Sequence, residues 1–201
     1  WNHSSNNMII NTNLYYMNYE NQLVLTGALD DVGSPIRENS GKSYRAGIEI
    51  ESAFKVSEKI NLAGNVSFSE NKNLDYVSRF NGELMNLGDT DISYSPSFIS
   101  SLAINYSPNS KLDLSLLNKH VGEQFMSNNG SSFSKLDSYS VTDLNFRYTF
   151  DELYLFDELS INLLINNLFS AEYVSNGYYY TYDDTWLSLI HISEPTRHHA
   201  I

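Results

Sequence analysis

The chain has 201 residues, enough for one domain with a full core, and a formal net charge of −12 at pH 7. Because phosphate binding needs clustered lysine and arginine, and the sequence has no such cluster, nucleic acid is not expected as a partner. Cysteine is absent, which excludes thiolate metal sites. No apolar run approaches the roughly 18 residues of a membrane-spanning helix, so the chain could cross a bilayer only as strands.

One unit repeats from about Met8 to Asn167: a strand that alternates apolar with polar side chains, followed in turn by a short link and a long polar one. A period of two places alternate side chains on opposite faces of a sheet. The expected strands, in chain order, are 8–27, 42–54, 60–71, 98–106, 112–121, 139–150 and 160–167. Short links are expected at 2–7, 55–59, 107–110 and 151–158, and long loops at 28–41, 73–95, 122–137 and from 168 onward.

Links that alternate between short and long are typical of an outer-membrane β-barrel, whose periplasmic turns are short and whose outside loops are long. The fold expected is therefore all-β: an antiparallel transmembrane β-barrel fragment of about seven strands that does not close. A soluble antiparallel sandwich is the alternative, because its strands also alternate. Six tyrosines near strand ends fit the aromatic girdles of a barrel: Tyr16, Tyr44, Tyr94, Tyr106, Tyr139 and Tyr148.

The segment from Leu163 to Tyr180 resembles the Asn-Leu-Phe-x-x-x-Tyr signature near the C-terminus of TonB-dependent outer-membrane receptors. Two further segments, 13–27 and 42–51, resemble the form of this family common among Bacteroidetes. The resemblance extends from Met8 to about Thr185. The residues at the signature positions are Asn167, Leu168, Phe169 and Tyr173.

The resemblance implies that residues 1–186 are the C-terminal part of a barrel of about 22 strands in the outer membrane of a Gram-negative bacterium. Such a barrel is filled by an N-terminal plug. It imports a scarce ligand, such as a ferric siderophore or haem, with energy from the TonB complex. The plug, the TonB box and the upstream strands are expected to lie outside this chain, so the chain by itself is not expected to transport. A passive porin or an adhesin is the alternative function.

Catalytic, cofactor and metal sites are not indicated. His3 and His120 are isolated, and the other histidines lie near the end of the chain without the spacing of a metal site. The carboxylates of Glu49 and Glu51 face the same side of a strand, an arrangement that acid–base chemistry can use, but in a lumen wall they would bond the plug or hold water. No nucleophile motif surrounds a serine, so an enzyme such as an outer-membrane lipase is the weakest alternative.

Aromatic residues in the long loops are the candidates for ligand contact, with outer-membrane lipid expected on the apolar side of the strands. The ligand expected is a small iron chelate. Loop tyrosines can instead pack on one another or lie at the membrane interface. The candidates are Phe80, Phe125, Tyr178, Tyr179 and Tyr180.

The pattern of strands stops at Leu187. Residues 187–197 match, codon for codon, the translation of a transposase-type sequencing adapter. We therefore expect 187–201 to be a library artefact that forms no domain, with a natural but divergent tail as the alternative. Pro195 is not expected in a barrel strand, so no strand is predicted here.

Overall fold

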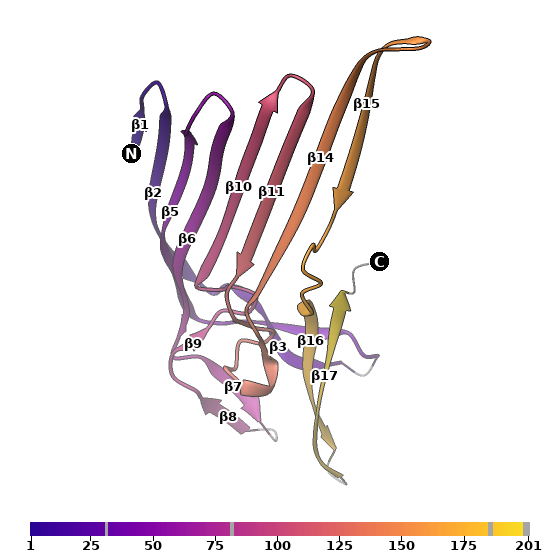
Figure 1. Cartoon of the computed structure of the whole chain (residues 1–201). Coiled ribbons are helices and arrows are strands. Elements are labelled where there is room, and N and C mark those ends of the chain that lie inside the picture. The colour runs from indigo at the N-terminus through magenta and orange to yellow at the C-terminus, as the bar shows by residue number, and fades with distance from the viewer. Residues whose placement is uncertain (31, 81–82, 185–186, 199–201) are drawn as a thin grey trace.

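The computed structural model describes residues 1–30, 32–80, 83–184 and 187–198. The main sheet is antiparallel, and its strands follow the order β1-β2-β5-β6-β10-β11-β14-β15, with the short β9 paired to β6 (Figure 1). No helix among the described residues is long and apolar enough to cross a membrane. The strands of this sheet are β1 (Asn2–Ser4), β2 (Met8–Glu20), β5 (Lys42–Lys55), β6 (Ile60–Leu74), β9 (Thr90–Asp91), β10 (Phe98–Asn109), β11 (Leu112–Val121), β14 (Tyr139–Leu153) and β15 (Phe156–Ile165).

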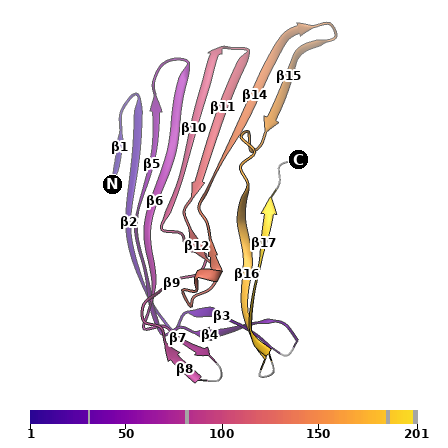
Figure 2. The same cartoon turned by 60° about the horizontal axis from the view of Figure 1, so that its bottom comes forward.

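The links alternate between short and long, as predicted. The hairpin turns lie at one end of the sheet and the long loops at the other (Figures 1 and 2). We call these the short-turn end and the long-loop end. The turns are closed by short polar side chains. The hydroxyl of Ser57 accepts the N–H groups of Lys59 and Ile60, and the amide oxygen of Asn109 accepts those of Lys111 and Leu112. Serine and asparagine favour turns for this reason.

Several predicted boundaries are wrong by a few residues or more. The link predicted at 2–7 contains β1, which pairs with β2. The strand predicted at 8–27 divides at Asn21, whose φ of 55° takes the chain out of the sheet. Asparagine tolerates this left-handed conformation, which ends regular pairing. The links predicted at 107–110 and 151–158 shrink to two-residue turns, because β10, β14 and β15 extend further than their apolar alternation.

The long loops contain regular structure that the sequence analysis did not predict. They contain two-stranded sheets of their own, and a short 3-10 helix, η1 (Ser132–Ser134), precedes β13. Apolar residues between turn-forming residues supply a partner strand within each loop, so local pairing is available. These strands are β3 (Leu23–Leu29) with β4 (Pro35–Asn39), β7 (Val77–Phe80) with β8 (Glu83–Asn86), and β12 (Gln124–Phe125) with β13 (Lys135–Leu136).

The region from 168 onward also differs from the prediction of a loop. The strand β16 (Tyr173–Asp184) pairs with β17 (Leu187–His198), so the expectation that no strand forms there is wrong. Pro195 lies opposite Gly177 in a sheet of two strands. A proline is tolerated where a strand has a neighbour on one side only, because its missing N–H need not serve a second strand. The origin of 187–201 stays a prediction, and 199–201 lie outside the described residues.

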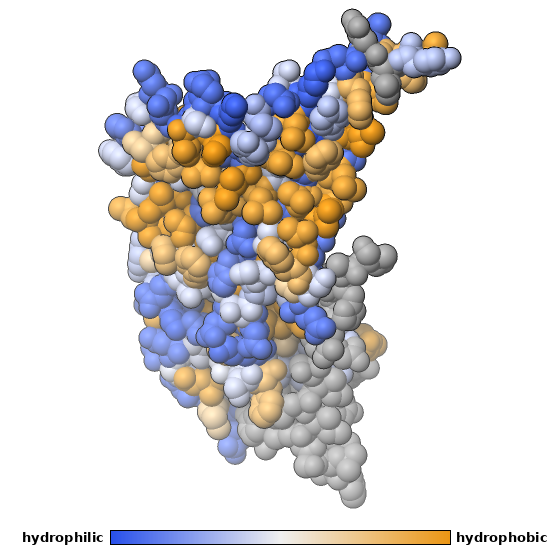
Figure 3. Space-filling model, viewed as in Figure 1, coloured by the Kyte–Doolittle hydropathy of each residue, from blue (hydrophilic) through white to orange (hydrophobic). Residues whose placement is uncertain are grey.

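The register of the main sheet separates the side chains into two faces. On one face, apolar residues line up across strands, as in the row Leu14, Ile48, Phe68 and Phe98. A second row joins Ile104, Leu116, Leu144 and Ile165. Figure 3 shows the resulting apolar band across the sheet. Leu14 is 74% exposed and Phe68 51%, and no second sheet of the described residues packs on them as a sandwich would require. We call this side the apolar face and the other the polar face.

In water without detergent, the chain is expected to associate rather than remain a monomer. The apolar face is wide and uncovered, and the free edge of β15 offers unpaired backbone groups to other chains. Light scattering after size exclusion should show polydisperse assemblies in buffer and smaller particles when detergent covers the apolar face. A single sharp monomer peak without detergent would contradict the exposure of the apolar face.

Candidate functional site

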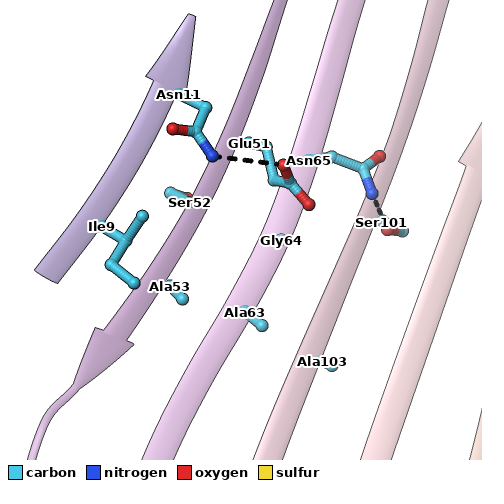
Figure 4. Close-up of a pocket in the computed structure, with 10 residues that line it drawn as sticks. All are labelled: Ile9, Asn11, Glu51, Ser52, Ala53, Ala63, Gly64, Asn65, Ser101 and Ala103. Carbon is cyan, nitrogen blue, oxygen red and sulfur yellow. Dashed lines mark hydrogen bonds between the residues drawn. The ribbon is translucent and has the colours of Figure 1, made fainter. Parts of the chain in front are cut away.

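The polar face carries a shallow hollow between β2 and β10, with a volume of about 340 Å³ (Figure 4). Two neighbouring rows of side chains form it, and each row crosses four strands. The first row is small and apolar: Ile9, Ala53, Ala63 and Ala103. The second row is polar: Asn11, Glu51, Asn65 and Ser101.

Amide side chains hold the carboxylates of this face. The Nδ2 of Asn13 donates to Glu49 at 3.1 Å, and the Nδ2 of Asn11 approaches Glu51 at 3.5 Å. Asn65 donates to Ser101 at 2.9 Å. The Oδ1 atom of Asn11 is buried and has no hydrogen-bond partner among the described residues. The hollow is therefore acidic, with acceptors in excess of donors.

Nearer the long-loop end, the guanidinium of Arg45 is bound by neutral groups. Its Nη1 donates to the hydroxyl of Ser95 at 2.8 Å and to the Oδ1 of Asn71 at 3.2 Å. This cation ties β5 and β6 to the segment between β9 and β10. The guanidinium of Arg45 is therefore held by these neutral groups rather than by the carboxylates of the hollow.

At the long-loop end, the loops pack on a small core of their own. Met126, Leu136 and Tyr179 are each less than 8% exposed and contact one another, with Val174 against them. The hydroxyl of Tyr179 donates to the Oγ of Ser131 at 3.2 Å. This loop core joins the loop of β12 and β13 to β16, which is distant from it in sequence.

Asn128, which is 1% exposed, connects three further segments. Its Nδ2 donates to the backbone oxygen of Leu25 in β3 at 3.1 Å. Its Oδ1 accepts from the backbone N–H of Ser93 at 2.9 Å and from the Nδ2 of Asn73 at 3.3 Å. Asn73 is fully buried and also donates to Thr90. A buried amide with these partners is costly to disrupt, because each would lose its hydrogen bond.

Tyr94 is a second junction. Its φ of 52° lies in the left-handed region, which a bulky residue rarely adopts. Its backbone N–H donates to the oxygen of Phe125 at 2.8 Å, and its hydroxyl donates to the backbone oxygen of Gly177. Partial burial raises the pKa of the Tyr94 phenol. These contacts bring the β12 and β16 segments beside the end of the β9 loop.

Electrostatics elsewhere in the loops are local. Burial, with a smaller contribution from the negative charge of Glu38, raises the pKa of Tyr76. Lys135 and Glu123 form an exposed ion pair, and the hydrogen bond to Glu123 raises the pKa of Lys135. No group of three histidine, aspartate or glutamate side chains suited to a metal occurs in the part of the chain that the structure describes.

The predicted ligand contacts occupy different environments. Phe125 is half-buried beside Tyr94, and Tyr178 is 53% exposed and stacks on Tyr180 at 6.1 Å between ring centroids. Tyr179 points the other way, into the loop core. Phe80 lies in β7, and its side chain is outside the described residues. Sequence reasoning did not find Asn128, since an asparagine-rich segment indicates only a loop. It expected Tyr94 in an aromatic girdle, whereas the structure places Tyr94 at a junction of loop segments.

The signature residues form a turn. Asn167 has a φ of 51° and is 9% exposed. Its side chain accepts the N–H of Ala171 at 2.8 Å and donates to the oxygen of the same residue at 2.9 Å, while its backbone N–H donates to Asp143 at 2.7 Å. The N–H of Leu168 donates to the oxygen of Thr142 in β14. Phe169 is 74% exposed, and Tyr173 stacks on Tyr139 at 4.5 Å. The signature thus redirects the chain from β15 to β16.

An open antiparallel sheet with one apolar face, one polar face, short turns at one end and folded loops at the other is the wall of a transmembrane β-barrel. The protein-family model described as TonB dependent receptor-like, beta-barrel matches residues 1–168 of the chain. The chain therefore belongs to the TonB-dependent receptor family, through its barrel. This is a family of receptors and transporters rather than enzymes.

Solved structures share the fold. The siderophore receptor PiuA from Acinetobacter baumannii is 16% identical, with a TM-score of 0.67 over 98% of this chain and 26% of its own. The ferric yersiniabactin uptake receptor FyuA from Yersinia pestis is 14% identical, with a TM-score of 0.63 over 98% of this chain and 27% of its own. The copper transporter OprC is 14% identical, with a TM-score of 0.64 over 98% of this chain and 28% of its own. The chain thus spans about a quarter of their length. No curated protein matches the sequence.

Proposed function

We propose that residues 1–186 are the C-terminal part of the barrel of an outer-membrane receptor that imports a scarce ligand with energy from the TonB complex. The observation that carries the proposal is a polar face opposite an apolar band, in a chain of the TonB-dependent receptor family. The apolar face would contact the lipid of a Gram-negative outer membrane, and the polar face would line the lumen. The TonB complex would act through a plug that lies outside this chain.

The ligand class we propose is a small iron chelate, such as a ferric siderophore or haem. Two of the similar structures carry siderophore-uptake names, which supports this class, and OprC is named as a copper transporter. The long-loop end would face outward. There the exposed Tyr178, its stacking partner Tyr180 and the half-buried Phe125 are the contacts we favour, with Phe80 as a further candidate. Tyr179 would support these residues from inside the loop core.

Uptake by the full-length receptor is expected to require an energised inner membrane. Cells that carry the receptor as their one outer-membrane iron transporter would be given a radiolabelled ferric siderophore, with and without a protonophore. Collapsing the proton gradient should stop accumulation and leave surface binding intact, because binding would use the loops and release would use the plug. Accumulation that persists with the gradient collapsed would favour the passive porin, and binding without any uptake would favour the adhesin.

A further inference from the structure

We propose that the tip of the β14–β15 hairpin, residues 154–156, is a docking surface for a periplasmic protein that offers an apolar pocket bordered by lysine or arginine. The inference rests on the proposed function, because it takes the short-turn end as the periplasmic end of the barrel. The surface lies on the barrel wall itself, at the end opposite to the loops proposed to contact the ligand.

The tip of this hairpin is apolar and uncovered. Tyr154 is 97% exposed, Leu155 81% and Phe156 57%. Figure 1 shows the hairpin reaching past the other turns of the short-turn end, which leaves its tip accessible. Exposed apolar groups mark interaction surfaces, and a tyrosine beside large apolar side chains is a typical anchor for a pocket in a partner protein.

The turn at the tip has residues that do not favour a turn. A two-residue hairpin turn prefers asparagine, aspartate and glycine, because its central residues commonly need a positive φ. Here the central residues are Tyr154 and Leu155, and Tyr154 has a φ of 53°. The turns closed by Ser57 and Asn109 use short polar side chains instead. Large apolar residues at a position that disfavours them are expected where they serve a function.

The reach of the hairpin excludes lipid as the occupant. Its last apolar pair on the apolar face is Phe150 and Leu159, and Phe150 packs edge-on against Tyr148 at 4.7 Å, as in an aromatic girdle. Tyr154 follows Phe150 by four positions. A strand rises about 3.3 Å per residue, so a tilt of about 40° places the tip roughly 10 Å beyond this girdle. The headgroup layer is about 5 to 8 Å thick, so the tip extends into the periplasm.

The charge of the hairpin selects a basic partner. Segment 151–158 contains four acidic residues and no basic one, whereas the turn at 56–59 pairs one glutamate with one lysine. Asp151 and Glu158 lie directly opposite each other, and like charges in this arrangement destabilise a hairpin. Lys111 binds Asp151 at 3.0 Å, but Glu158 belongs to none of the four ion pairs among the described residues. A cation from a partner would relieve this repulsion.

The apolar tip and the carboxylate can be covered together. Phe156 and Glu158 are two positions apart on β15, so their side chains lie on the same face of the hairpin. A pocket that encloses Phe156 therefore has Glu158 at its edge. This arrangement fits an apolar pocket with a lysine or arginine at its border, and it does not fit a surface of lipid phosphates, which would repel the carboxylates.

Photo-crosslinking in cells of the natural host tests the proposal. The full-length receptor would carry Leu155→p-benzoylphenylalanine, and crosslinked peptides would be identified by mass spectrometry after irradiation. Position 155 should crosslink to a periplasmic protein, at a peptide that carries lysine or arginine beside large apolar residues. The matched change at Val56, which is 58% exposed on another turn of the same end, should not capture this protein.

A charge reversal tests the role of the carboxylate. In the receptor with the crosslinker at 155, Glu158→Lys should lower the yield of this crosslink roughly tenfold, because an attractive contact becomes repulsive. The hairpin should remain folded, since the change removes the like-charge pair with Asp151. Glu58→Lys, the same reversal on the turn at 56–59, should leave the yield unchanged.

Four outcomes would overturn the proposal. They are no protein captured at position 155, a crosslink to phospholipid or to the receptor itself, a partner peptide without a basic residue, and an unchanged yield in Glu158→Lys. Uptake of a radiolabelled ferric siderophore is measured separately in the same cells. A receptor that gives the expected crosslink but takes up no siderophore would contradict the proposed function and leave the docking surface intact.

Discussion

Arginine at position 102 is expected to destabilise the barrel of the full-length receptor by roughly 2 to 4 kcal/mol, whereas arginine at position 105 should have a mild effect. Leu102 is 47% exposed within the apolar band, so an arginine there would place its charge against lipid. Asn105 lies on the polar face, where the hydroxyl of Ser115 donates to its Oδ1 at 2.6 Å. A charge at this position can remain hydrated.

Urea unfolding of the receptor in lipid bilayers measures both changes. The two positions lie on the same strand and receive the same residue, so each serves as the control for the other. Equal destabilisation by Leu102→Arg and Asn105→Arg would show that the faces are assigned wrongly. A larger effect at position 105 would reverse the assignment.

Replacing Asn128 with leucine is expected to loosen three loops at once. The change keeps the branched shape of the side chain, although leucine is larger, and it removes the partner of the backbone oxygen of Leu25 and of the N–H of Ser93. It also removes one of the two hydrogen bonds that the amide of Asn73 donates. Buried groups left unsatisfied cost about 1 to 3 kcal/mol each, and partial access to water should hold the total to about 2 to 4 kcal/mol. The free energy of local opening should fall by this amount.

Hydrogen exchange of the receptor in detergent would locate the effect. Exchange should accelerate together in β3, in the segment around Ser93, and in 122–137. The matched control is Asn129→Leu, because within the described part of the chain the Oδ1 of Asn129 accepts only from Ser127 and Ser131 in its own loop. That change should accelerate exchange in 122–137 alone. An effect of Asn128→Leu confined to the same loop would show that the loops are not joined through Asn128.

The candidate site could be predicted only in part. The aromatic composition of the loops predicted Tyr178 and Tyr180 as ligand contacts, and this role stays a prediction; in the structure the two rings stack on each other. It could not separate them from Tyr179, whose ring enters the loop core. Whether a tyrosine in a run of three is exposed depends on which elements pack beside it, and those elements come from 122–137. The signature that begins at Asn167 can be found in the sequence. That it forms a turn depends on hydrogen bonds to Asp143 and Thr142 in another strand.

The long antiparallel sheet follows from local features of the sequence. Alternation of apolar and polar residues is a local property, and it assigns the faces of the long strands because the side-chain period of a strand is two. Links such as Val56 to Lys59 carry their own turn chemistry, so the antiparallel order of the strands follows from neighbours along the chain.

The packing of the loops on one another and the position of the hollow depend on contacts between residues far apart in the sequence. Asn128 reaches Leu25 across 103 positions, and Arg45 reaches Ser95 across 50. Loop residues follow no period, so their partners depend on the distances between strand ends, which the completed sheet sets. The alanine row forms in the same way: three unremarkable residues on separate strands become one surface only when the register aligns them.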